Sequence, residues 1–92
     1  MIIRILGQGQ FEVKSSLFDD LNAIDNRIVE CVRTGDEAGF RAGLAELTGL
    51  VIRAGVSLPD EEIVASAAVI PPADLTLKEA AAIFTGEGIF AG

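Results

Sequence analysis

The sequence has no histidine, no tryptophan and no tyrosine, and it has only one cysteine among its 92 residues. A single thiol without histidine cannot form a zinc site of the usual nitrogen and sulfur ligands, nor a disulfide within the chain. The Ser-His-Asp and Cys-His groupings of nucleophilic catalysis are excluded for the same reason. We therefore expect a protein that is not an enzyme and that carries no cofactor.

Basic residues are also scarce, since seven Lys and Arg stand against 14 Asp and Glu, which gives a net charge of −7. Nucleic-acid binding needs clustered positive charge, so nucleic acid is not an expected partner. The acidic excess lies in residues 57–92, which carry six acidic residues and one basic residue. This pattern is typical of a solubilising surface, although it would also favour a basic partner.

Long hydrophobic runs are absent as well. Apolar stretches such as residues 67–70 are far shorter than the roughly 20 residues that cross a bilayer. Residues 1–4 lack the basic start and long apolar core of a secretory signal. We expect a cytoplasmic protein without direct membrane insertion, and the length predicts a single domain over residues 1–92.

Two short alternating segments, residues 2–6 and 10–14, predict a β-hairpin closed by the glycine-containing turn at residues 7–9. A register in which paired residue numbers sum to 16 separates apolar from polar side chains. Its pairs are Ile5 with Phe11, Ile3 with Val13, and Arg4 with Glu12. A phosphate-binding loop is disfavoured, because a strand follows the glycines where a helix should begin.

Two amphipathic helices follow. The first is expected to begin at a Ser15 or Ser16 cap and to run to about Arg33, and Gly35 ends it. The second begins at Asp36 alone, or at Thr34 with Glu37, and closes at Gly55. Their apolar stripes are Leu17, Leu21, Ile24, Ile28 and Cys31 in the first helix, and Phe40, Leu44, Leu47 and Val51 in the second. So short a connection predicts an antiparallel helical hairpin.

The second helix has more apolar and small residues than one buried face requires. Ala38, Ala42, Ala45 and Ile52 lie on one flank of its main stripe, and Leu50 and Ala54 lie on the other. Either the hairpin sheet and the C-terminal segment cover these flanks, or another protein chain does. The sequence leaves both alternatives open.

The C-terminal segment completes an α+β fold class: an N-terminal β-hairpin, an antiparallel helical hairpin, and then this less regular part. Residues 57–62 predict a cap followed by a short helical turn, and residues 66–70 are a candidate third strand stopped by Pro71. Thr76 and Glu79 have capping-box spacing before a helix of about two turns. Its expected apolar face is Leu77, Ala80, Ala81 and Phe84, and residues 89–90 form an apolar tail that could dock on the core.

The sequence gives little support for a catalytic or metal-binding role of any individual residue. Cys31 falls on the apolar stripe of the first helix, where a buried structural thiol is expected. Asp19, Asp20 and Asp25 are expected on the polar side of that helix, but no aromatic residues suggest a glycosidase-like cleft around them. The three adjacent acids at residues 60–62 lack the alternate spacing of a calcium loop.

The succession of short motifs resembles the PspA-associated domain family, PspAA, over nearly the whole chain. The matching segments are Met1–Phe11, Leu21–Asn26, Gly35–Arg41, Leu58–Glu62 and Pro71–Asp74. The resemblance implies association with PspA, the coiled-coil, membrane-remodelling effector of the phage-shock envelope stress response. It implies an adaptor or regulator rather than a catalyst, recruited to the inner face of the membrane through that partner.

The candidate partner-binding residues combine a secondary strip of the first helix with the flank of the second. They are Phe18, Asp25, Val29, Val32 and Ile52. A long charged helix of a coiled-coil partner could meet such a face of mixed apolar and acidic residues. The competing interpretation is that Phe18 and Val29 pack under the hairpin. Two other functions stay open, namely a homo-oligomeric structural module and a small-molecule-binding regulator.

Overall fold

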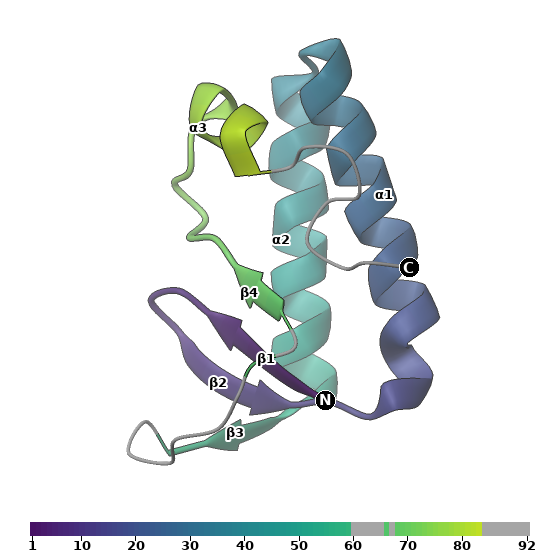
Figure 1. Cartoon of the computed structure of the whole chain (residues 1–92), viewed down its shortest axis with the longest axis vertical. Coiled ribbons are helices and arrows are strands. Elements are labelled where there is room, and N and C mark those ends of the chain that lie inside the picture. Colours follow the sequence, from purple (N-terminus) through teal and green to yellow (C-terminus); the bar gives the residue numbers. More distant parts are fainter. Residues whose placement is uncertain (60–65, 67, 84–92) are drawn as a thin grey trace.

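The computed structural model describes residues 1–59, 66 and 68–83 as a four-stranded mixed sheet, a pair of long helices and a short third helix (Figure 1). The elements are β1 (Ile2–Ile5), β2 (Gly9–Glu12), a 3-10 turn η1 (Ser15–Leu17), α1 (Phe18–Thr34), α2 (Glu37–Ala54), β3 (Val56–Leu58), β4 (Ala68–Ile70) and α3 (Leu77–Ile83). The predicted α+β class, with its hairpin of strands and hairpin of helices, is confirmed.

The sheet has the strand order β3-β2-β1-β4. β1 is antiparallel to β2 and parallel to β4, and β2 is antiparallel to β3. One face carries the buried side chains and packs against the long helices. The buried apolar residues from this part of the chain are Ile3, Ile5, Phe11, Val13, Ala68 and Ile70, and the polar side chain of Gln10 in β2 is buried as well and donates to the Pro59 carbonyl at 3.2 Å.

The predicted hairpin register is wrong, although the predicted faces are right. The paired residue numbers sum to 14, so that Ile3 lies opposite Phe11 and Ile5 lies opposite Gly9. The turn is centred one residue earlier than expected, because the Gln8 N–H donates to the Ile5 carbonyl at 2.9 Å and Gly7 adopts the positive φ of 87°. A change of two in the sum keeps each side chain on its face, and the predicted Arg4–Glu12 pairing is replaced by Arg4 opposite Gln10.

The joint between the long helices forms largely as predicted. Gly35 ends α1 in the left-handed conformation, with φ at 78°. The Asp36 carboxylate then caps α2 by accepting a hydrogen bond from the Gly39 N–H at 2.9 Å, which settles the choice between the two predicted caps. At the other end of α1 the prediction is wrong, because the 3-10 turn precedes the helix and neither serine side chain caps it.

The two apolar stripes meet in the core. All four predicted α2 positions are buried, as are the central three of α1, while Leu17 and Cys31 at the two ends of the α1 stripe are partly buried. The helices approach closely at Gly43, where an added Cβ would lie 2.8 Å from Ile28 Cγ1. An exposed ion pair between Arg27 and Glu46, with an N···O distance of 2.6 Å, also joins them.

The C-terminal half brings one correction. Ser57 lies in a strand and not at a helix cap, because Val56–Leu58 pairs with β2. The candidate third strand is confirmed as β4, shortened to Ala68–Ile70.

α3 has the predicted length and the predicted capping box. Thr76 Oγ1 accepts from the Glu79 N–H at 3.1 Å, and the Thr76 N–H donates to Glu79 Oε1 at 3.0 Å. These hydrogen bonds from the Thr76 backbone and side chain lower the pKa of the Glu79 carboxyl. Ala80 is buried as expected, whereas Ala81 is exposed. The predictions for Phe84 and for residues 60–62 and 89–90 lie outside the described residues.

Candidate docking surface

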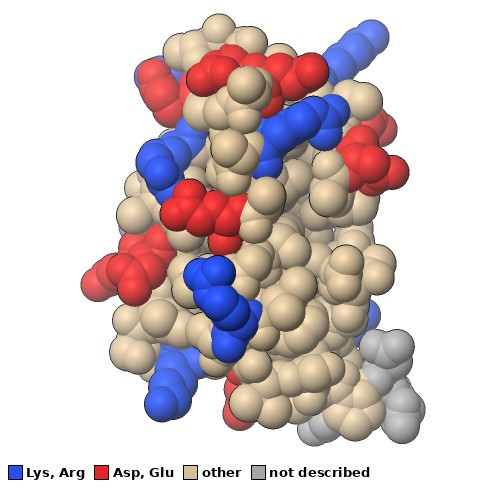
Figure 2. All heavy atoms as spheres, turned by 180° about the vertical axis from the view of Figure 1, so that it is seen from behind, with Lys and Arg blue, Asp and Glu red and all other residues tan. Residues whose placement is uncertain are grey.

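The outer flank of α2 is uncovered. Ala38, Ala42, Ala45 and Ile52 are all exposed, and Ile52 keeps 43% of its surface open to solvent. We call these four residues, together with Gly49 between them, the α2 face. Figure 2 looks onto this side of the molecule, where charged side chains gather over the upper half and the left, and an area without charged side chains lies at the lower right. The sequence left open whether other parts of this chain or another protein chain cover this flank. The described sheet and α3 do not cover it.

The α2 face has a regular spacing. Its residues recur along α2 at steps of four, three, four and three. A mean step of 3.5 residues is the spacing by which one helix packs along another in a coiled coil. An added Cβ at Gly49 would meet nothing within 4 Å, so the surface over the middle of α2 is low and open.

A groove between α1 and α2 adjoins the α2 face. The volume of this groove is about 530 Å³. The lining combines an apolar floor with charged rims: Asp20, Ala23, Ile24, Arg27, Glu46, Leu50 and Arg53. Leu50, the predicted second flank of α2, is half-buried in its floor. The groove and the α2 face thus form one continuous surface on the helical side of the molecule.

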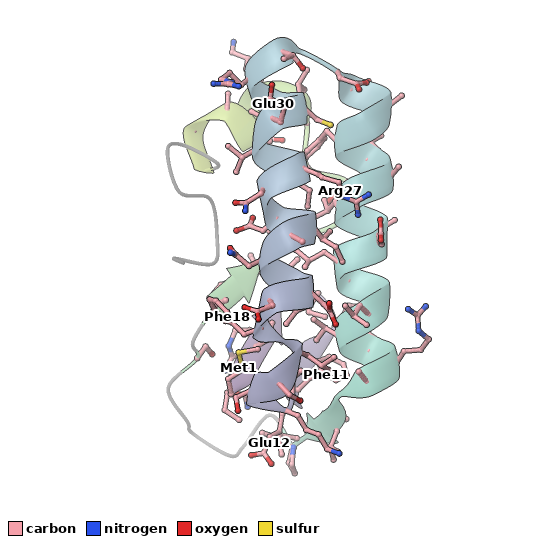
Figure 3. All side chains as sticks on the ribbon, turned by 90° about the vertical axis from the view of Figure 1, so that its right-hand side faces the viewer. Met1, Phe11, Glu12, Phe18, Arg27 and Glu30 are labelled. Atoms are coloured by element: carbon pink, nitrogen blue, oxygen red, sulfur yellow. The ribbon has the colours of Figure 1, made fainter. Side chains whose placement is uncertain are left out.

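The other predicted docking residues lie elsewhere. Phe18, Val29 and Val32 are partly buried and pack against the core. Figure 3 places Phe18 on the side of α1 away from α2, and Arg27 on the side toward it. Phe18, Val29 and Val32, which we call the α1 strip, therefore lie along one side of α1. They do not form a continuous surface with Ile52 on α2.

The predicted position of Asp25 is wrong. It was assigned to the polar side of the first helix, but it is fully buried. Its position explains the difference, because it follows Leu21 by four residues and precedes Ile28 by three, which places it at the edge of the buried stripe. Asp25 is therefore not part of the exposed surface of α1.

The remaining reactive side chains do not converge on a chemical site. Partial burial, followed by the negative charges of Asp36 and Glu30, raises the pKa of the Cys31 thiol. A raised pKa keeps the thiol protonated and poorly nucleophilic near neutral pH. Within the residues that the structure describes, no group of three His, Cys, Asp or Glu side chains could hold a metal ion.

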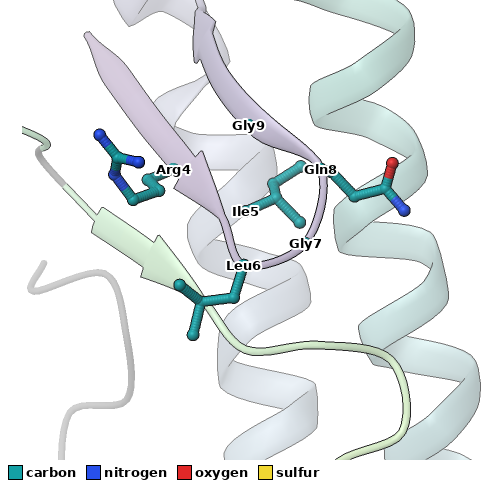
Figure 4. A pocket seen from close by; sticks show the side chains of 6 residues that line it. All are labelled: Arg4, Ile5, Leu6, Gly7, Gln8 and Gly9. Atoms are coloured by element: carbon teal, nitrogen blue, oxygen red, sulfur yellow. The ribbon is translucent and has the colours of Figure 1, made fainter. Parts of the chain in front are cut away.

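The hollow at the hairpin tip is a weak ligand site. It has a volume of about 400 Å³ and is lined by the consecutive residues from Arg4 to Gly9. Figure 4 shows the Arg4 and Gln8 side chains pointing away from one another. Because no polar groups converge there, the hollow lacks the arrangement that orients a small molecule.

These features define a small α+β domain in which the outer side of α2 is exposed. A family model described as PspA-Associated protein, PspAA, matches residues 1–92. The chain therefore belongs to the PspA-associated family, and the resemblance found in its sequence motifs is confirmed. No curated protein and no solved structure matches it. None of the described helices combines the length and apolar character needed to cross a membrane.

Sequence reasoning found most of the α2 face but missed its extent. Ala38, Ala42, Ala45 and Ile52 stood out as excess apolar residues beside the core stripe, whereas Gly49 was not included. The repeated steps of four and three from Ala38 to Ile52 were the signal that could have found it.

Proposed function

We propose that this chain is a non-catalytic adaptor that binds a PspA-like coiled-coil protein through the α2 face. Membership of the PspA-associated family supports the choice of partner. The observation that carries the choice of surface is the exposed stripe of α2 that ends in Ile52, a large apolar side chain left open to solvent. Through such a partner the adaptor would reach the inner face of the membrane during envelope stress.

The shape of the α2 face suits a helical partner. Small side chains at Ala38, Ala42 and Ala45 allow the backbone of a second helix to approach closely, and the spacing lets it follow α2 over several turns. Ile52 then supplies the larger apolar contact at one end. Burial of such side chains is worth roughly 25 cal/mol per Å² of apolar surface removed from water.

Gly49 adds a second argument for a partner. A glycine inside a helix destabilises the isolated chain by roughly 0.5–1 kcal/mol relative to alanine. Within the described part of the chain, no neighbouring atom would clash with a side chain at Gly49, so packing inside this chain does not explain why the residue is glycine. A partner helix that packs closely against this position would account for it.

Light scattering on the purified chain, with and without the PspA-like protein of the same organism, tests the proposal. We expect a monomer that enters a larger complex only when the PspA-like protein is added. A monomer that never binds it would reject the adaptor function. A stable dimer of the chain alone would favour the alternative, a homo-oligomeric module that uses the same α2 face.

A further inference from the structure

Two charges of opposite sign flank the α2 face at the spacing of a heptad. Glu46 and Arg53 directly follow Ala45 and Ile52, two residues of the α2 face, and lie seven residues apart on the same helix. Seven residues correspond to about 10.5 Å along a helix, or about two turns. The two charges therefore occupy the same flanking position in successive repeats of the α2 face. In coiled coils, charges at such positions determine which partner binds and in which orientation.

The groove between α1 and α2 repeats this pattern with the signs reversed. Glu46 and Arg53 line its α2 side, whereas Asp20 and Arg27, also seven residues apart, line its α1 side. The ion pair of Arg27 with Glu46 brings two opposite charges to one level of the groove. Because the two helices run in opposite directions (Figure 1), Asp20 and Arg53 come level with each other two turns away. Positive and negative charge are thus balanced on this surface and alternate along it.

The charges that border the α2 face are accessible. Arg53 is exposed, and within the residues that the structure describes it takes part in no hydrogen bond or ion pair. Glu46 is paired with Arg27, but the two side chains are 51% and 61% exposed. An exposed ion pair of this kind contributes little to stability. Glu46 can therefore turn to a charge on a partner at little cost.

We propose that the PspA-like helix that packs on the α2 face carries charges of both signs along one flank. A basic side chain meets Glu46, and an acidic side chain one heptad away meets Arg53. This inference rests on the proposed function, because it specifies the chemistry of the helix that the α2 face binds. Charge complementarity carries it, since a flank with charge of only one sign would be repelled at either Glu46 or Arg53.

Opposite charges one heptad apart would fix both the register and the direction of the partner helix. A slip of the partner by one heptad would bring like charges together at Glu46 or at Arg53, and so would a reversal of its direction. Such mismatches exclude wrong pairings in coiled coils. The small side chains of Ala38, Ala42 and Ala45 offer few features that could specify a register themselves. The flanking charges would supply that specificity.

Titration of fluorescently labelled PspA-like protein with the full chain tests the inference. The informative variants are Glu46→Lys and Arg53→Glu. Their matched controls are Glu30→Lys and Arg33→Glu, which make the same charge changes in another exposed ion pair, on α1 and outside the groove. At about 50 mM salt we expect each informative variant to weaken binding by about 10-fold, with a smaller loss at about 500 mM salt. The control variants should bind as the unaltered chain does, and thermal unfolding by circular dichroism checks that each variant is folded.

Glu46→Lys and Arg53→Glu change the net charge in opposite directions, so a long-range effect of net charge cannot weaken binding in both. Weaker binding in both, relative to the controls, would support the inference. Tighter binding in one of them would identify a partner flank of a single sign and would overturn it. Affinities equal to those of the controls would also overturn it, while the adaptor function stands. Absence of binding by the unaltered chain would reject both proposals together.

Discussion

At the scale of single residues, Asp36 holds the joint between α1 and α2. Its carboxylate accepts from the Gly39 N–H and also lies 3.9 Å from the Cys31 sulfur on the preceding helix. The side chain therefore ties the start of one helix to the end of the other. Sequence reasoning located this cap because Asp follows the helix-ending glycine directly, a local signal that does not depend on tertiary packing.

We predict that Asp36→Ala lowers the free energy of unfolding by about 1 kcal/mol, because the Gly39 N–H loses its acceptor. For a domain of this size, that loss corresponds to a melting temperature lower by roughly 4–8 °C. Urea denaturation followed by circular dichroism measures it. Asp36→Asn is the control, since asparagine also caps helices, and a loss as large as that of the alanine variant would contradict the capping role.

At the scale of elements, the helices and their buried faces could be predicted from local periodicity, but the pairing of the strands could not. The α2 stripe of Phe40, Leu44, Leu47 and Val51 follows directly from the 3.6-residue repeat. β3 was missed because three residues show no alternation, and the strand depends on its pairing with β2. The hairpin register depends on which residues form the turn. Gly7 and Gly9 can both adopt a positive φ, so the sequence does not decide between a turn centred on residue 7 and one centred on residue 8.

The close packing of α1 against α2 predicts opposite effects for two glycines in the same helix. Gly43→Ala should destabilise the protein by about 1–3 kcal/mol, because its Cβ would meet the buried Ile28 side chain. Gly49→Ala should stabilise it by about 0.5–1 kcal/mol, since the surrounding space is open and alanine favours the helix. Urea unfolding of the two variants side by side checks the pair. Similar changes of the same sign would contradict the described helix packing.

At the scale of the whole molecule, the sheet and the α1 side enclose the core and leave the α2 face open. The sequence predicted an excess of apolar residues on that helix, but whether other parts of the chain cover them depends on how distant elements pack. Whether the α1 strip would be exposed or packed against the core was open for the same reason. Phe18, Val29 and Val32 proved to contact the core, and Ile52 is the predicted docking residue that remains exposed.

The affinity of the PspA-like protein for Ile52→Asp, measured by calorimetry, tests the central claim most directly. The matched control is Val69→Asp, because Val69 on β4 is 46% exposed, close to the 43% of Ile52, and lies outside the α2 face. If the α2 face binds the partner, Ile52→Asp should weaken binding by about 30-fold or more, because a charge would replace the largest apolar contact of the face. Val69→Asp should bind as the unaltered chain does. Undiminished binding by a folded Ile52→Asp variant, or an equal loss in both variants, would contradict the claim.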